Sequence, residues 1–214
     1  MTYGDAIFAR YWAEHSLPAG YRRVEYLEST GAQWIDTKLN NFTDVTYKMR
    51  MKWTSTTGNA QHIGQGNGWF FGIVRSLLWR VPTDGGSGIP PENIPIANIG
   101  TWYAVTFRRD TAGASLAVDD YSYSSSGIRV SSNENAWLFA ISGSGNAGFK
   151  CCCAVSYTQL YSNGALVRNF IPCVRESDNK PGLYDLCGSI CSLTGTPFYI
   201  NSGTGADFTW GELQ

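Results

Sequence analysis

The chain has 214 residues, of which 43% are hydrophobic, 14% are aromatic and only 15% are charged. A formal net charge of −1 argues against a protein that binds nucleic acid by neutralising phosphates, and the apolar content argues against disorder. Low charge, 24 glycines and abundant aromatic residues are typical of a compact all-β protein with many tight turns. No apolar run of roughly 18 residues is present, so we expect no membrane-spanning segment.

Residues 1–16 are predicted to form a short N-terminal α-helix. Its apolar side chains form two i,i+4 pairs, Ile7 with Tyr11 and Phe8 with Trp12. Because so short a helix is marginal alone in water, we expect it either to fold back on its own domain or to attach the chain to another subunit or to further copies of itself. The segment lacks the basic and the continuous apolar regions of a secretory signal, so we expect synthesis in a cytoplasm without a signal peptide.

After this segment, apolar residues recur at every second position, which indicates strands. The clearest case is 44–53 (DVTYKMRMKW), whose alternation predicts one buried face and one face in water. Other strands are expected at 21–28, 33–37, 61–65, 69–74, 77–81, 102–108, 114–118, 137–142, 152–161, 165–172, 182–185 and 198–201. So many short strands separated by glycine-rich turns indicate a β-sandwich or barrel. Four tryptophans in these strands are expected to lie in the core: Trp34, Trp53, Trp102 and Trp137.

The six cysteines give no clear signal of a metal site or a disulfide. They are Cys151, Cys152, Cys153, Cys173, Cys187 and Cys191, and no C-x2-C pair of the kind zinc sites use is present. In a strand the first and third cysteines of the triplet point to one face and the second points to the other. Three interpretations stay open: reduced core residues, a disulfide such as Cys187–Cys191, or a metal site.

Three stretches of the sequence are similar to one known family. The opening LPAGYRRVEYLESTGAQWIDT (17–37), the central NIGTWYAVTFR (98–108) and the closing TPFYINSGTG (196–205) resemble laminin G-like jelly-roll domains of the concanavalin A-like lectin/glucanase superfamily, of the type found in phages, prophages and gut-bacterial surface proteins. The resemblance covers 17–214. It implies an all-β, two-sheet antiparallel jelly-roll sandwich, with 1–16 as a docking or attachment segment. It also implies a binding or adhesion module of a kind that is mostly non-catalytic and in some members binds glycans.

Catalytic residues of the family's glucanases are not matched. The pattern expected of those enzymes is E-x-D-x-x-E or E-x-D-x-E on one strand, in which alternation places the first two carboxylates on one face. Here Glu25 and Glu28 lie three residues apart and fall on opposite faces, as do the adjacent Asp119 and Asp120. We therefore expect no enzyme and no cofactor. Calcium, which relatives sometimes bind, is an open alternative through Asp119, Asp120 and loop carbonyls, although no D-x-D-x-D-G loop is present.

A ligand site is predicted around the 66–68 turn and the proline-rich loop that follows Val81. Sugar sites combine an exposed aromatic face with placed polar groups, and this region offers both. The candidate residues are Trp69, Phe71, Trp79, Asn67 and Asp84. Alternatively, the outward ring of this group covers the sheet or docks the N-terminal helix.

Together these observations predict a non-catalytic, lectin-like adhesion module displayed on a virion (as tail, fibre or capsid decoration) or on a bacterial cell surface. Its expected partners are a host or mucosal glycan or another host-surface receptor, and other virion subunits through the N-terminal helix. A homo-oligomer is possible, and nucleic acid is not expected as a partner. Two alternatives stay open, a purely structural virion assembly protein without glycan binding and a glycoside hydrolase.

Overall fold

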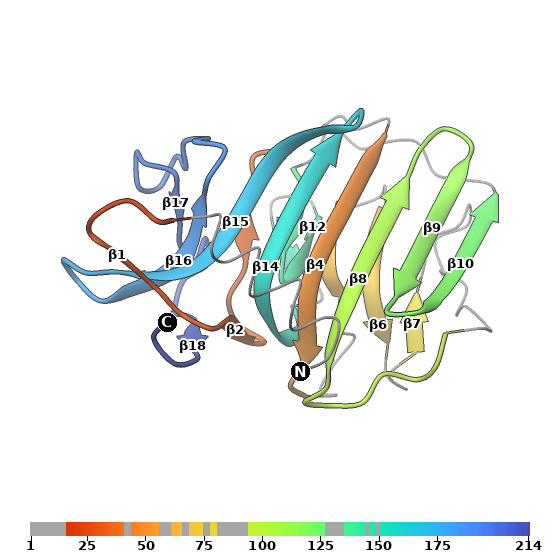
Figure 1. The fold of residues 1–214 in the computed structure, drawn as a ribbon, viewed down its shortest axis with the longest axis horizontal. Coiled ribbons are helices and arrows are strands. Elements are labelled where there is room, and N and C mark those ends of the chain that lie inside the picture. The colour runs from red at the N-terminus through yellow and green to blue at the C-terminus, as the bar shows by residue number, and fades with distance from the viewer. Residues whose placement is uncertain are drawn as a thin grey trace.

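A computed structural model of the chain describes residues 16–40, 44–55, 61–65, 69–74, 78–80, 94–126, 135–143, 146–148 and 150–214 (Figure 1). This part of the chain contains strands and turns and no helix. The predicted N-terminal helix, with Ile7, Phe8, Tyr11 and Trp12, lies outside the described residues.

The strands of the described residues are, in chain order, β1 (Tyr21–Arg23), β2 (Leu27–Thr30), β3 (Ile35–Asp36), β4 (Val45–Trp53), β5 (Gln61–Gln65), β6 (Trp69–Val74), β7 (Leu78–Arg80), β8 (Trp102–Arg109), β9 (Gly113–Val118), β10 (Tyr121–Ser126), β11 (Trp137–Leu138), β12 (Ala140–Gly143), β13 (Asn146–Gly148), β14 (Cys152–Ser162), β15 (Ala165–Arg175), β16 (Lys180–Asp185), β17 (Phe198–Tyr199) and β18 (Thr209–Trp210).

Two sheets form the sandwich. The larger sheet is antiparallel and runs in the order β10-β9-β8-β4-β14-β15-β16-β17, with β1 on β15, β2 on β14 and β18 on β2. The smaller sheet runs β13-β12-β5-β11-β3, with β6 on β5 and β7 on β6. Figure 1 shows the larger sheet in front and β6, β7 and β12 behind it. The two-sheet sandwich predicted from the sequence is confirmed.

The core lies on the inward face of the larger sheet, as the alternation of β4 predicts. Its odd-numbered residues from Val45 to Trp53 are at most 1% exposed, whereas Lys48 between them is exposed. β8 and β9 add Phe107 and Leu116, which are fully buried. Burial of this apolar face stabilises the sandwich by about 25 cal/mol per Å² of surface removed from water.

The structure differs from the sequence expectations in several places, of which three follow. The predicted strand 137–142 is interrupted at Phe139, whose φ of 65° divides it into β11 and β12. Residues 121–126 form β10, where no strand was predicted. The prediction missed it because its serines have low strand propensity and because it lies exposed at the edge of the sheet. Trp102 is half-buried rather than in the core, because it faces outward opposite Lys52 and contacts that ammonium at 4.8 Å.

Candidate functional site

The predicted ligand site around Trp69–Asp84 is not assembled by the described residues. Trp79 is 1% exposed and packs edge-on against Trp53 and Tyr103, with ring centroids 6.2 Å and 5.4 Å away. Its ring therefore belongs to the core and offers no face to a ligand, which corrects the expectation for this residue. Of the other candidates, Trp69 and Phe71 lie on β6 but their side chains are outside the described part, as are Asn67 and Asp84 entirely.

A different aromatic pair lies on the outer face of the smaller sheet. β3 and β11 pair so that Leu138 is opposite Ile35 and Trp137 is opposite Asp36. Ile35 and Leu138 are fully buried and face the core, so Asp36 and Trp137 face outward. Trp34, two residues before Asp36, lies on the same side and stacks on Trp137 with ring centroids 3.9 Å apart and an interplanar angle of 26°.

Trp34 and Trp137 are covered to different degrees. Trp137 is 6% exposed, whereas Trp34 is half-buried. Trp137 thus supports Trp34 from beneath, and Trp34 is the ring that solvent reaches. Trp34 was expected in the core because it alternates with buried neighbours; the pairing of Ile35 with Leu138 shows that it lies on the opposite face.

The closing segment of the chain fixes the position of Trp34. The backbone N–H of Trp34 donates to Asn201 Oδ1 at 3.2 Å, and the N–H of Ser202 donates to the Trp34 carbonyl at 2.8 Å. A Cβ atom at Gly203 would lie 2.9 Å from Trp34 Nε1, so the absence of a side chain there lets the backbone pack against the edge of the indole. The ring is therefore held at its edge as well as from beneath.

Asp36, which shares the outward side of β3 with Trp34, gathers further polar groups around its carboxylate. Asp36 Oδ2 accepts hydrogen bonds from Lys38 Nζ at 2.7 Å and from Asn135 Nδ2 at 3.1 Å. Lys38 has a side chain that is 43% exposed, so its ammonium is open to solvent beside the carboxylate. We call this set of residues the Trp34 shelf: Trp34, Asp36, Lys38, Asn135, Trp137 and Gly203.

Gln33 joins the segments that form the Trp34 shelf. Its side chain is 1% exposed, and Nε2 donates to the carbonyls of Ala206 at 3.2 Å and Asp207 at 3.0 Å. Its Oε1 accepts from the N–H of Thr30 at 2.9 Å. The opening and closing sequence segments, about 170 residues apart, therefore meet as one hydrogen-bonded unit. One sequence signal pointed to the shelf: Trp34 and Asp36 lie in the opening segment, and Gly203 lies in the closing segment.

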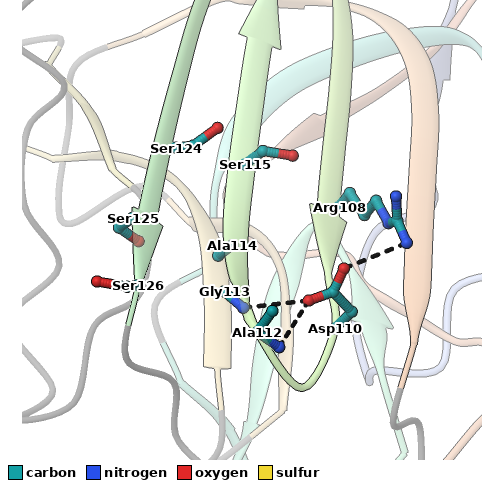
Figure 2. A pocket seen from close by; sticks show the side chains of 9 residues that line it. All are labelled: Arg108, Asp110, Ala112, Gly113, Ala114, Ser115, Ser124, Ser125 and Ser126. Atoms are coloured by element: carbon teal, nitrogen blue, oxygen red, sulfur yellow. Dashed lines mark hydrogen bonds and ion pairs between the residues drawn. The ribbon is translucent and has the colours of Figure 1, made fainter.

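A pocket lies where β8, β9 and β10 meet (Figure 2). It has a volume of about 370 Å³ and is bordered by Arg108, Asp110 and a row of serines from β9 and β10. The guanidinium of Arg108 pairs with Asp110 at 3.2 Å, and the Asp110 carboxylate accepts from the N–H groups of Ala112 and Gly113. These bonds lower the pKa of Asp110. No aromatic ring lines this pocket among the described residues.

The described residues contain no group of three histidine, cysteine, aspartate or glutamate side chains placed to hold a metal ion. Asp119, considered above for calcium, uses its Oδ1 to accept the N–H of Ala104 at 2.8 Å within a turn where its φ is 50°. In this part of the chain no helix is long and apolar enough to cross a membrane.

Comparison with known proteins supports the fold. No family model matches the sequence, and no curated protein sequence matches it. A solved structure of a candidate carbohydrate-binding protein from Bacteroides ovatus matches with a TM-score of 0.57 and 11% identity, over 90% of this chain and 59% of that one. Domains LG4-5 of the mouse laminin alpha1 chain match with a TM-score of 0.43 and 10% identity, over 81% of this chain and 49% of theirs.

This chain therefore spans less than two thirds of the length of either protein. At such identities the likeness concerns the fold alone. Together with the two sheets described above, the larger of them antiparallel, it confirms the fold class predicted from the sequence. The chain has a two-sheet jelly-roll sandwich fold, which it shares with the Bacteroides ovatus protein.

Proposed function

We propose that the protein is a non-catalytic carbohydrate-binding module and that the Trp34 shelf holds its ligand. The observation that carries this proposal is the solvent-reachable ring of Trp34, stacked on Trp137 and bordered by Asp36, Lys38 and Asn135. The fold shared with a candidate carbohydrate-binding protein supports it.

The chemistry of the Trp34 shelf suits a sugar. A pyranose has an apolar face of C–H groups that can stack on an indole, and hydroxyls around its rim that need donors and acceptors. Trp34 supplies the ring, the Asp36 carboxylate supplies an acceptor, and Lys38 and Asn135 supply donors. Because Trp137 and Gly203 already hold the indole in place, binding orders little of the protein, and the entropic cost of forming the site is small.

A structural role is the competing interpretation. The same residues close the sandwich, since the opening and closing segments meet beside Trp34. If closure were their only task, replacing Trp34 would lower stability and change no ligand binding. The two roles are therefore separated by measuring binding and stability on the same variants.

The test begins with the full chain on an array of neutral and acidic oligosaccharides, followed by titration calorimetry with the strongest ligand. We expect Trp34→Ala to weaken binding up to about tenfold, the effect of losing one aromatic stacking contact, and Trp34→Phe to weaken it less. The matched control is Trp102→Ala, which removes another half-buried tryptophan from the other sheet and should leave the affinity unchanged. Circular dichroism establishes that each variant is folded.

Two results would contradict the proposal. One is the absence of binding to every glycan on a diverse array. The other is a Trp34→Ala variant that is folded and binds as the wild type does. Loss of binding in Trp69→Ala but not in Trp34→Ala would instead support the site predicted around Trp69.

We further propose, on the sequence resemblance alone, that the module is displayed on a virion or bacterial surface for adhesion and that residues 1–16 attach it there. Sedimentation velocity of the full chain and of a 17–214 truncation tests the attachment segment. Assembly that is lost with residues 1–16, in a chain that binds no glycan, would favour a purely structural assembly protein. Neighbouring genes for tail or capsid proteins would support placement on a virion, and their absence would count against it.

A further inference from the structure

Two thiols of the cysteine triplet meet in the core. Cys151 directly precedes β14 and Cys153 lies within it, and the Sγ atoms of these two residues are 2.7 Å apart. Both side chains are 0% exposed and belong to the core cluster between the sheets. Cys152 points the other way, toward the Gly31 turn, where a Cβ on that glycine would lie 3.0 Å from the Cys152 Sγ. The triplet therefore places one specific pair of sulfurs together.

The backbone around this pair allows a bond between the two sulfurs. Residues two apart in an extended chain have Cα atoms about 6.6 Å apart, at the upper end of the range of ~4.4–6.8 Å that disulfides span, so closing the bond requires a local shift of the backbone that brings the two Cβ atoms together. Neighbouring strands hold the backbone on both sides of the pair. The N–H of Cys151 donates to the Phe139 carbonyl at 3.0 Å, and the carbonyl of Cys152 accepts from the N–H of Thr54 at 3.0 Å.

We propose that Cys151 and Cys153 are a redox-active pair that closes to a disulfide when the protein meets a small oxidised disulfide such as glutathione disulfide. This inference is independent of the carbohydrate-binding proposal. It also concerns a different pair from the Cys187–Cys191 bond considered from the sequence. Cys187 is exposed and Cys191 is buried, and all six cysteines are thiols in the structure.

The reaction proceeds by thiol–disulfide exchange. One cysteine loses its proton, and the thiolate attacks one sulfur of glutathione disulfide, which releases one glutathione and leaves a mixed disulfide. The second cysteine, also deprotonated, then attacks the protein sulfur of that mixed disulfide and releases the second glutathione. The two thiols lose two protons and two electrons, and glutathione disulfide gains them to become two thiols.

Burial sets the rate of this reaction. Removal from water, with a smaller contribution from the contact with Cys151, raises the pKa of the Cys153 thiol, so little thiolate is present at neutral pH. Exchange must therefore wait for local opening at the start of β14, and we expect it to be slow at neutral pH and faster in mild denaturant. The ring encloses only three residues, so we expect little change in thermal stability when it closes.

Mass spectrometry of one tryptic peptide tests the proposal. Cleavage after Lys150 and Arg168 releases residues 151–168, which contain the whole triplet and no other cysteine. The full chain is incubated with glutathione disulfide, with and without urea below the unfolding transition, and is then unfolded and alkylated with N-ethylmaleimide. We expect the peptide to carry one alkyl group instead of three and to be lighter by two hydrogens, and dithiothreitol to restore three alkylation sites. Cys173, buried on β15, is the internal control and should be alkylated in every sample.

Two variants locate the bond. Cys152→Ser should keep the crosslink, with no alkyl group on the peptide, and Cys153→Ser should lose it. Three alkyl groups on the oxidised wild-type peptide, in urea as well as in buffer, would overturn the proposal. So would a crosslink that is absent from Cys152→Ser, because the bond would then involve Cys152. If Cys153→Ser does not fold, the wild-type and Cys152→Ser results still decide the question.

Discussion

Replacing the buried amide side chain of Gln33 tests how the opening and closing segments of the chain are joined. Its side chain is 1% exposed, donates to two carbonyls of the closing segment and accepts from the N–H of Thr30 at 2.9 Å. The substitution Gln33→Ala removes these three bonds and the two that Gln33 Oε1 accepts from the hydroxyls of Ser29 and Thr30 at 3.2 Å, and it leaves the strands themselves intact.

The size of the effect follows from which groups lose their partner. The carbonyl of Ala206 keeps a hydrogen bond from Asn201 Nδ2 at 3.0 Å, whereas the Asp207 carbonyl and the Thr30 N–H lose the bond that Gln33 makes. A buried polar group left without a partner costs about 1–3 kcal/mol. Because Thr30 is exposed and water can replace part of its bond, we expect the free energy of unfolding to fall by about 2–3 kcal/mol. For a domain of this size that lowers the melting temperature by roughly 4–12 °C.

Urea denaturation followed by tryptophan fluorescence and circular dichroism measures this change. The matched control is Gln159→Ala, because Gln159 is half-buried and its bonds to Tyr161 at 3.1 Å and Asn169 at 3.5 Å lie where water can replace them. We expect that control to cost less than about 1 kcal/mol. A Gln33→Ala variant no less stable than Gln159→Ala would refute the argument that Gln33 joins the two segments.

Three further predictions concern packing, charge and pH. Gly182→Ala should unfold at clearly lower urea, because the added methyl group would overlap the main-chain oxygen of Tyr199. Asp185→Asn should lower the free energy of unfolding by about 3–5 kcal/mol, since it leaves the buried Arg168 guanidinium without its carboxylate at 3.6 Å. Its control, Glu176→Gln in an exposed ion pair, should cost less than about 1 kcal/mol. Equal melting temperatures for these two variants would contradict this expectation. Burial raises the pKa of Tyr199 to about 12 from an ordinary value near 10, so its contribution to stability is complete below about pH 10 and is lost as the pH rises toward 12. Between pH 9.5 and 11.5, Tyr199→Phe should therefore lose less stability than the wild type. Equal losses in the two proteins would show that Tyr199 does not cause this pH dependence.

The central strand and its core face could be predicted from the sequence. Strict alternation from Val45 to Trp53 fixes which side chains share a face, and the apolar set must face the core wherever the sheet is packed on one side. β10 could not be predicted in this way, because an exposed strand at the edge of a sheet carries no apolar pattern. It forms because its backbone pairs with β9, which is a tertiary event.

The Trp34 shelf shows the same division. The predicted strand 33–37 already places Trp34 and Asp36 on one side of the chain, since alternation is a local property of an extended backbone. The sequence by itself could not determine whether that side faces the core or solvent. Only the pairing of Ile35 with Leu138, and the arrival of Gly203 from the far end of the chain, decided this. Strand pairing and long-range packing depend on contacts between segments distant in sequence, and no local pattern encodes them.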